Sequence, residues 1–161
     1  MSRYTYDGNT SFWWLTAVDD VEAITVDEIE AGVDISSAIP KDGFKPGTSN
    51  TRVKNDDITT AFDAELPGTW SAPVELTIIR DDETDDAYDE LKIRGTEGFL
   101  VVRDAVAYST AIAAAQVVDV YPATTMTPRR MDTAGNERVK VVIDLAITAE
   151  PGFDVAVVDG S

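Results

Sequence analysis

The stretch that decides the fold class reads ERVKVVIDLAIT and spans residues 137–148. Apolar side chains occupy its alternate positions, at Val139, Val141, Ile143, Leu145 and Ile147. The other face is marked by Lys140, Asp144 and Thr148. Because successive side chains of a strand point to opposite faces of a sheet, this alternation predicts a β-strand with one buried face. Turn-forming residues at 132–136 precede it, so we expect a hairpin with the strand before them.

Outward from this stretch, apolar or alternating segments predict further strands at residues 12–18, 57–66, 74–80, 98–103, 115–121 and 155–158. The strand at 57–66 is expected to end at a Pro67-Gly68 turn. Six to eight antiparallel strands in this order suit a β-sandwich or a partly rolled barrel.

Two segments carry helix signals. Thr25 and Glu28 have the spacing of a capping box, and Gly32 stands where a left-handed helix exit is expected. These signals predict one or two helical turns. The acidic start of residues 81–94 and its helical spacing predict a helix there, with Gly95 as its stop. The expected fold class is therefore mainly β with one flanking α-helix.

The chain has 161 residues, which fits a single domain spanning 1–161. Residues 36–56 form a long segment of turn chemistry within it, and the termini are expected to be extended. Long loops in compact domains are commonly functional or order against a partner. Ile39, Phe44 and Val53 are apolar groups in this segment, and they either fold back onto their own domain or contact a partner.

Composition excludes several classes of function. The chain has no histidine and no cysteine, which removes Ser-His triads, His-ligated or thiolate metal sites and disulfides. Thirty acidic residues against thirteen basic ones give a net charge of −17, which disfavours binding to phosphate backbones and to anionic membranes. No apolar stretch approaches the roughly 20 residues that span a bilayer, and no signal peptide is expected.

The groups that could carry chemistry are few. The acidic run at 81–86 resembles a calcium loop but lacks the glycine and closing glutamate of an EF-hand. Trp13, Trp14 and Trp70 could stack sugars, although large aromatics more often lie in cores or interfaces. The doublet Arg129-Arg130 is too small for a nucleic-acid patch and suits pairing with carboxylates across a subunit contact. No catalytic, metal or cofactor site is expected.

The order of segments resembles that of a known family. EIEAGVDI (28–35), DGF (42–44) and LPGT (66–69) are followed by VELT (74–77), GTEGFLVVR (95–103) and VVDVYP (117–122). This ordered set resembles the major tail tube proteins of long-tailed, siphovirus-type phages or archaeal viruses. The likeness runs from about residue 16 to residue 158.

The resemblance implies a structural virion protein that assembles with itself into stacked, hexameric rings. These form the hollow tail tube through which viral DNA passes without specific binding. Further implied partners are the tape-measure and tail-end proteins, with no membrane and no cofactor, and the implied location is the virion tail, after synthesis in the host cytoplasm. The expected inter-subunit contacts are Ile39, Asp42, Gly43, Phe44, Val53, Arg129 and Arg130. The expected bore-facing residues are Glu75, Asp119, Lys140 and Asp144.

Three alternatives stay open at this point. A carbohydrate-binding or adhesion β-sandwich predicts a stable monomer with exposed tryptophans. An acidic hydrolase fits worst, because the chain lacks histidine, cysteine and any nucleophile motif. A tail terminator, a head–tail connector or a contractile-type tube subunit would share a related fold, and the sequence separates these poorly from a tube subunit.

Overall fold

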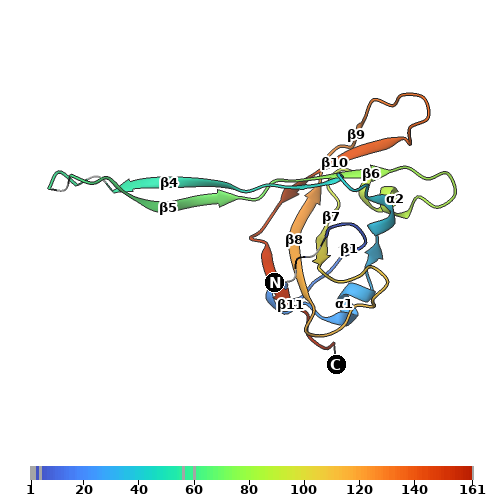
Figure 1. Cartoon of the computed structure of the whole chain (residues 1–161), viewed down its shortest axis with the longest axis horizontal. Helices are drawn as coiled ribbons and strands as arrows, with labels where there is room; N and C mark the ends of the chain where they lie inside the picture. Colours follow the sequence, from blue (N-terminus) through green and yellow to red (C-terminus); the bar gives the residue numbers. More distant parts are fainter. Residues whose placement is uncertain (1–2, 4, 56, 60, 161) are drawn as a thin grey trace.

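The computed structural model describes residues 3, 5–55, 57–59 and 61–160, which form a β-rich body with one long projecting hairpin (Figure 1). The described strands are β1 Thr10–Leu15, β2 Val33–Asp34, β3 Phe44–Pro46, β4 Ser49–Asn55, β5 Ala64–Ser71, β6 Val74–Ile79, β7 Glu97–Asp104, β8 Val117–Thr125, β9 Arg129–Arg130, β10 Lys140–Ile147 and β11 Gly152–Ala156. The helices are α1 Val26–Glu30 and α2 Asp86–Leu91, with 3-10 turns η1 Val21–Ala23 and η2 Ser36–Ala38. The expected extended termini include residues 1, 2, 4 and 161, which lie outside the described residues.

All named strand pairs are antiparallel, and the main sheet runs in the order β2-β1-β7-β8-β10-β6-β3. The start of β8 also pairs with β11, whereas its end pairs with β10, so β8 passes from one part of the sheet to the other. The described residues form eleven strands where six to eight were expected, because β2, β3 and β9 are only two or three residues long. The mainly β, antiparallel fold class is confirmed.

Two hydrophobic clusters hold the body together. One contains Leu76 and Ile143 from β6 and β10 and Leu100 from β7. The other contains Val101 from β7, Val118 from β8 and, among others, Ile24 and Ile29 near and within α1. Alternate side chains of β7 therefore enter different clusters, and this strand is covered on both faces. The alternation predicted for residues 139–147 is confirmed, since Val141, Ile143 and Leu145 are buried in the first cluster.

Helix α1 begins at the predicted capping box. The Thr25 hydroxyl accepts a hydrogen bond from the Glu28 amide at 3.1 Å, and the Glu28 carboxylate accepts one from the Thr25 amide at 3.0 Å. The left-handed exit expected at Gly32 is wrong, because the left-handed glycines of the described chain are Gly8 and Gly95. Gly32 instead permits close packing, since a Cβ there would lie 2.7 Å from Leu15 Cδ1.

Helix α2 is shorter than the expected 81–94. The Asp81 carboxylate accepts hydrogen bonds from the amides of Glu83 and Thr84, at 2.9 and 3.4 Å. This local turn competes with helix formation, so the helix starts only at Asp86. It ends at Leu91, with Lys92 as its C-cap, so the stop predicted at Gly95 is wrong, although Gly95 has a left-handed φ of +89° in the turn that follows. Neither helix in the described part of the chain has the length and apolar character that a membrane-spanning helix needs.

The projecting hairpin, hereafter the arm, consists of β4 and β5 and the turn between them (Figure 1). The strand expected at 57–66 is wrong, because the chain turns between Asn55 and Ala64 and β5 continues through Pro67 and Gly68. The sheet partner of β5 is β4 alone, so a proline can stand in it without breaking a wider sheet. The register shifts by one residue beside Gly68 and Thr69, which marks a bulge on β5.

The arm is continuous with the body. Strand β3 pairs with β6 just as β4 pairs with β5, and the Gly47 amide donates to the Pro73 carbonyl at 2.8 Å between the two ladders. The expected loop at 36–56 therefore contains η2, β3 and β4 as far as Asn55, and Asp56 lies outside the described residues. The arm and the β3–β6 pair form one long hairpin, and only its base lies against the body.

Candidate assembly surfaces

The arm exposes apolar side chains to solvent. Val53 and Leu66 lie opposite one another in the β4–β5 register and are 53% and 54% exposed. At the turn Ile58 is fully exposed and Phe62 is 79% exposed. A two-stranded hairpin with no covered face is only marginally stable in water, so this surface is suited to packing on another molecule. Of the expected contact residues in segment 36–56, Val53 is the one on the arm.

The other expected contacts of this segment lie at the base of the arm. Ile39 and Phe44 are partly buried and pack on the first hydrophobic cluster, with the Phe44 ring centroid 5.2 Å from that of Phe12. Gly43 is buried, and its carbonyl accepts a hydrogen bond from the Thr77 amide at 2.7 Å. Asp42 is exposed. The structure thus gives Ile39 and Phe44 a place in their own domain, and their contact with a neighbouring copy stays a prediction.

An aromatic series links the arm to the core. Trp70, in β5, lies 6.2 Å from Phe153 between ring centroids, and Phe153 lies 5.7 Å from Tyr121. Tyr121 in turn lies 6.2 Å from Phe44. Burial raises the pKa of Tyr121 to about 12, with the charge of Asp119 as a smaller cause. These contacts fix the base of the arm. No local sequence pattern predicts them, because the four aromatic residues come from four distant segments of the chain.

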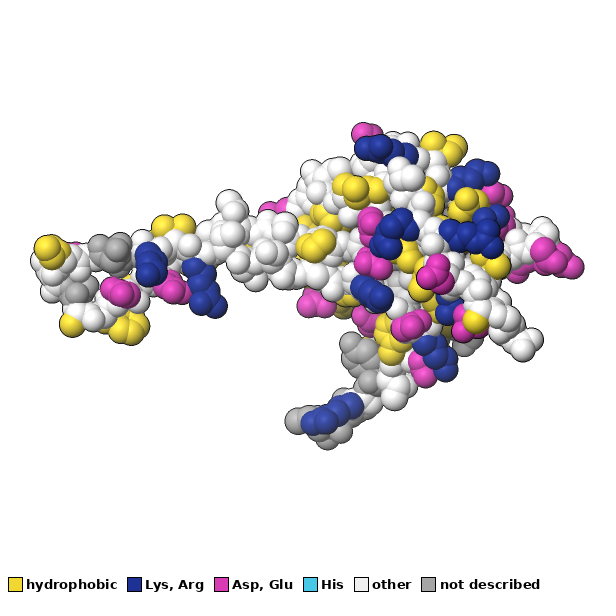
Figure 2. Space-filling view, turned by 90° about the horizontal axis from the view of Figure 1, so that it is seen from above, with side chains coloured by type: hydrophobic (Ala, Val, Ile, Leu, Met, Phe, Trp, Pro, Cys, Tyr) yellow, Lys and Arg dark blue, Asp and Glu magenta, His cyan; other side chains and the backbone are white. Residues whose placement is uncertain are grey.

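Charged residues gather on the outward face of β3, β6, β9 and β10, hereafter the upper face, where Figure 2 shows Lys and Arg side chains clustered. Glu75 and Asp144 lie directly opposite each other in the register of β6 and β10. Two like charges in this position repel, but Arg129 Nη2 lies 3.8 Å from the Glu75 carboxylate and 3.6 Å from that of Asp144. Lys45 Nζ lies 4.0 Å from Glu75.

Three of the four residues expected to face the bore share this upper face. Lys140 and Asp144 have the same parity on β10, and Glu75 pairs with Asp144. Asp119 lies elsewhere, on β8, where its carboxylate accepts a hydrogen bond from the Asp154 amide at 2.9 Å. Burial raises the pKa of Asp119, and the charges of Asp154 and Asp104 add to the effect. The structure therefore separates Asp119 from the other three.

The doublet Arg129-Arg130 forms β9, paired with Val142 and Val141 of β10. Arg129 contacts the upper face, whereas Arg130 is exposed and forms no ion pair within the described residues. The hairpin predicted at turn 132–136 is confirmed, but its first strand has only two residues. Met126 and Met131, on either side of β9, are 44% and 41% exposed.

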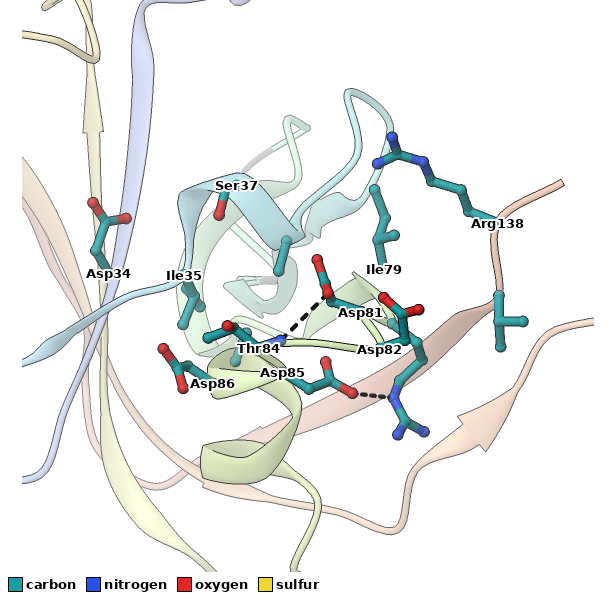
Figure 3. Close-up of a pocket in the computed structure, with 14 residues that line it drawn as sticks. Asp34, Ile35, Ser37, Ile79, Asp81, Asp82, Thr84, Asp85, Asp86 and Arg138 are labelled. Carbon is teal, nitrogen blue, oxygen red and sulfur yellow. Dashed lines mark hydrogen bonds and ion pairs between the residues drawn. The ribbon is translucent and has the colours of Figure 1, made fainter.

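A cavity of about 830 Å³ lies at the end of β6 furthest from the arm (Figure 3). Five aspartates and two arginines line it, namely Asp34, Asp81, Asp82, Asp85 and Asp86 with Arg80 and Arg138. The Arg80 guanidinium pairs with Asp85 and lies 3.6 Å from the centre of the Tyr88 ring. Amide hydrogen bonds from Glu83 and Thr84 lower the pKa of Asp81.

This cavity has no arrangement that suits catalysis or metal binding. Asp34 and Asp81 accept turn hydrogen bonds and Asp85 pairs with Arg80. The side chains of nucleophile type that line it are the hydroxyls of Ser37 and Thr84. Across the described part of the chain, no three carboxylates lie close enough together to hold a metal ion. The cavity is best described as a charged surface feature.

The tryptophans do not form a sugar platform. Trp14 is 1% exposed and belongs to the first hydrophobic cluster. Trp13 packs on the second cluster, with the Arg103 guanidinium 5.1 Å from its ring centre. Trp70 is 39% exposed but rests on Phe153 at the base of the arm. The three rings serve the core and the arm base.

Two of three comparisons with known proteins give matches. The model of a family described as phage tail tube protein matches residues 1–160. A comparison with curated proteins finds no match. Among solved structures, a chain in the anti-feeding prophage baseplate, 6-fold symmetrised, superposes with a TM-score of 0.59 at 10% identity, covering 92% of this chain and 95% of that one.

Two further structures are similar. A chain of the anti-feeding prophage tube-terminating cap has a TM-score of 0.55 at 14% identity, covering 90% of this chain and 88% of the other. The SPP1 tail tube protein has a TM-score of 0.56 at 14% identity, covering 94% of this chain and 81% of the other. At such low identities these likenesses establish the fold.

Proposed function

The chain belongs to the phage tail tube protein family, and from this premise we propose that its copies close into hexameric rings that stack into a hollow tube for viral DNA. Its role in the tail is structural. The observation that carries the assembly proposal is the arm, a two-stranded hairpin on which Val53 and Leu66 are each more than half exposed in the single chain. Burial of such side chains against a neighbouring copy would stabilise both partners.

The physical logic of a ring follows from the free sheet edges. Strands β2 and β3 end the main sheet, and each is only two or three residues long. Short edges limit uncontrolled pairing, and closure of several subunits into one barrel removes them altogether. A ring that stacks head-to-tail makes a heterologous interface, which does not close and generates a tube. Sixfold symmetry in the proposal is supported by the fold likeness to a chain of the 6-fold symmetrised baseplate.

We propose that the upper face lines the bore. Glu75, Lys140 and Asp144 share it, and the carboxylates of Glu75 and Asp144 form ion pairs with Lys45 and Arg129, so these charges are largely compensated. Such a surface offers passing DNA neither a strong basic patch nor a sticky apolar one. Asp119 would then lie away from the bore, beside β11.

The remaining parts of the proposal follow from the family. In this proposal the protein has no catalytic activity. Its further partners are the tape-measure and tail-end proteins. It reaches the virion tail after synthesis in the host cytoplasm. The inter-subunit contacts proposed are those of the arm and its base, including Ile39, Asp42, Gly43, Phe44 and Val53, together with Arg129 and Arg130.

Electron microscopy of the purified protein across a series of concentrations and salts tests this function. We expect rings or hollow tubes of uniform width from the intact chain. A variant in which residues 48–72 are replaced by a short turn should fold, because the deleted residues contribute little to either cluster, and it should fail to form tubes. Tubes formed equally well by this variant would remove the arm from the interface. A persistent monomer of the intact chain that binds glycans would favour an adhesion domain instead.

A further inference from the structure

The β9–β10 hairpin differs in charge from the rest of the molecule. Residues 126–140, hereafter the basic hairpin, contain four basic and two acidic residues in a chain whose net charge is −17. Arg129 is held by Glu75 and Asp144, and Arg138 lines the aspartate-rich cavity beside α2, whereas Arg130 forms no ion pair among the described residues. The exposed Met126 and Met131 add apolar surface beside these charges. Exposed cations next to exposed thioethers suit contact with an acidic protein surface.

The opposite charge is concentrated around α1. Residues 5–40 contain eight acidic residues and no basic one. A groove of about 330 Å³, hereafter the acidic groove, is lined by Thr16, Ala17, Asp19, Asp27, Glu28, Ala31 and Gly32. Glu28 is used within the capping box, but Asp19 and Asp27 have no basic partner within 4 Å among the described residues. The apolar and small members of the groove leave room for an inserted side chain.

The two features lie at opposite ends of the body. Figure 1 shows the basic hairpin at the top of the view and α1 at the bottom, across the width of both hydrophobic clusters. A single chain therefore cannot bring them together. Two copies related by a head-to-tail arrangement can, and repetition of that contact continues without closing.

We propose that the basic hairpin of one copy docks into the acidic groove of the next copy, with Arg130 directed at Asp19 and Asp27. This inference rests on the proposed function, because it assigns one contact within the assembled tube. Charge complementarity favours a second copy as the occupant. DNA is the weaker candidate, since a hairpin of net charge +2 on a chain of −17 offers little counterion release. The larger cavity beside α2 is a poorer receptor because it already holds Arg80 and Arg138.

Charge reversal tests the contact. Arg130→Glu and Asp19→Lys should each raise the protein concentration needed for tube formation by about tenfold or more, because each places like charges in the contact. The double variant should restore assembly toward that of the intact chain. Arg94→Glu is the matched control, since Arg94 is an exposed arginine outside the hairpin and the change in net charge is the same. Circular dichroism and thermal unfolding verify that all variants fold.

Cysteine trapping gives an independent readout, because the chain has no cysteine of its own. Tubes grown from a mixture of Arg130→Cys and Asp19→Cys subunits should form a disulfide-linked dimer under oxidation, whereas tubes of either variant alone should not. Such a bond requires the two Cα atoms to approach within about 7 Å.

The outcomes separate this inference from the proposed function. Equal assembly of Arg130→Glu and Arg94→Glu, with no rescue in the double variant and no cross-link, overturns the docking contact while leaving the tube function intact. DNA binding that Arg130→Glu weakens while assembly is unchanged also overturns it, because Arg130 would then face the bore and not the next copy. Failure of the intact chain to form tubes under all conditions speaks against the proposed function itself.

Discussion

The arm and the β7–β8 pair are both antiparallel strand pairs of similar length, yet they hold opposite positions in the molecule. In β7, Leu100 and Val101 are fully buried on opposite faces, one in each hydrophobic cluster. In the arm, Val53 and Leu66 are each more than half exposed. In both pairs the backbone N–H and C=O groups between the strands form hydrogen bonds with each other. The comparison teaches that the cover on the faces of a strand pair decides whether the pair belongs to the domain core or stays exposed to solvent.

Matched leucine truncations give the largest contrast between the two regions. Leu100→Ala removes a fully buried side chain and should lower the free energy of unfolding by about 2–5 kcal/mol. Leu66→Ala removes an exposed one and should change it by less than about 0.5 kcal/mol. Urea unfolding of the monomer measures both. A large destabilisation by Leu66→Ala would mean that the arm packs on its own domain in solution.

Glycine substitutions sharpen the same contrast on a smaller scale. A Cβ at Gly98 in β7 would lie 2.5 Å from Trp14 Cζ2 and 2.7 Å from the Leu15 carbonyl oxygen, neither of which can move freely. Gly98→Ala should therefore cost about 1–3 kcal/mol. A Cβ at Gly68 in the arm would lie 2.5 Å from the hydroxyl of the exposed Thr51 and 3.1 Å from its carbonyl oxygen, and the hydroxyl can rotate away at the loss of its 2.8 Å hydrogen bond to the Thr69 carbonyl. Gly68→Ala should cost less than half as much in the same thermal unfolding experiment.

Alkaline pH tests the junction between arm and body. Tyr121 ionises near pH 10 when unfolded and at about 12 in the folded protein. The stability that comes from keeping it neutral is fully present below pH 10 and is lost as the pH rises through about 12. Between these values the free energy of unfolding should fall more steeply for the intact chain than for Tyr121→Phe. If the free energy of unfolding falls equally with pH in both proteins, Tyr121 is exposed to water, and the aromatic contacts at the base of the arm do not bury it.

Surface ion pairs should show the smallest effects. Arg52→Ala breaks a contact of 3.3 Å to Glu65 on the arm and should change the free energy of unfolding by about 0–0.5 kcal/mol. Arg129→Ala should cost somewhat more, up to about 1 kcal/mol, because it leaves Glu75 and Asp144 opposed without Arg129 between them. Added salt should reduce the difference between the two variants, and a difference that persists at high salt would argue against a charge effect.

Local patterns in the sequence identified much of the body. The alternation along residues 139–147 and the capping box of Thr25 and Glu28 each depend on neighbours a few positions apart, and the structure confirms both. The same logic failed at residues 57–66. An alternating pattern there was assigned to a strand, but the strands lie on either side and the turn falls within the pattern. Alternation indicates a two-faced strand only when one face is buried, and at the arm tip nothing buries it.

The candidate surfaces were less accessible to sequence analysis. Strand parity is a local property, so it places Lys140 and Asp144 on the same face of β10, but only the pairing of β6 with β10 brings Glu75 to that face. Asp119 does not lie there, because its place depends on β8 pairing with β11, a long-range contact. The placement of these residues in the bore stays a prediction, and so do the contacts with a neighbouring copy.

The sequence by itself determined the fold class, the family and the exclusion of histidine and cysteine chemistry, because these follow from composition, periodicity and the order of segments. Only the tertiary structure decided which strands are covered on both faces, that an arm projects from the body, and that basic and acidic surfaces lie at opposite ends. Arg103 illustrates the reason, since it is fully buried through hydrogen bonds to Ser11, Ala107 and Gln116. Such positions depend on contacts between residues distant in sequence, and no local pattern encodes them.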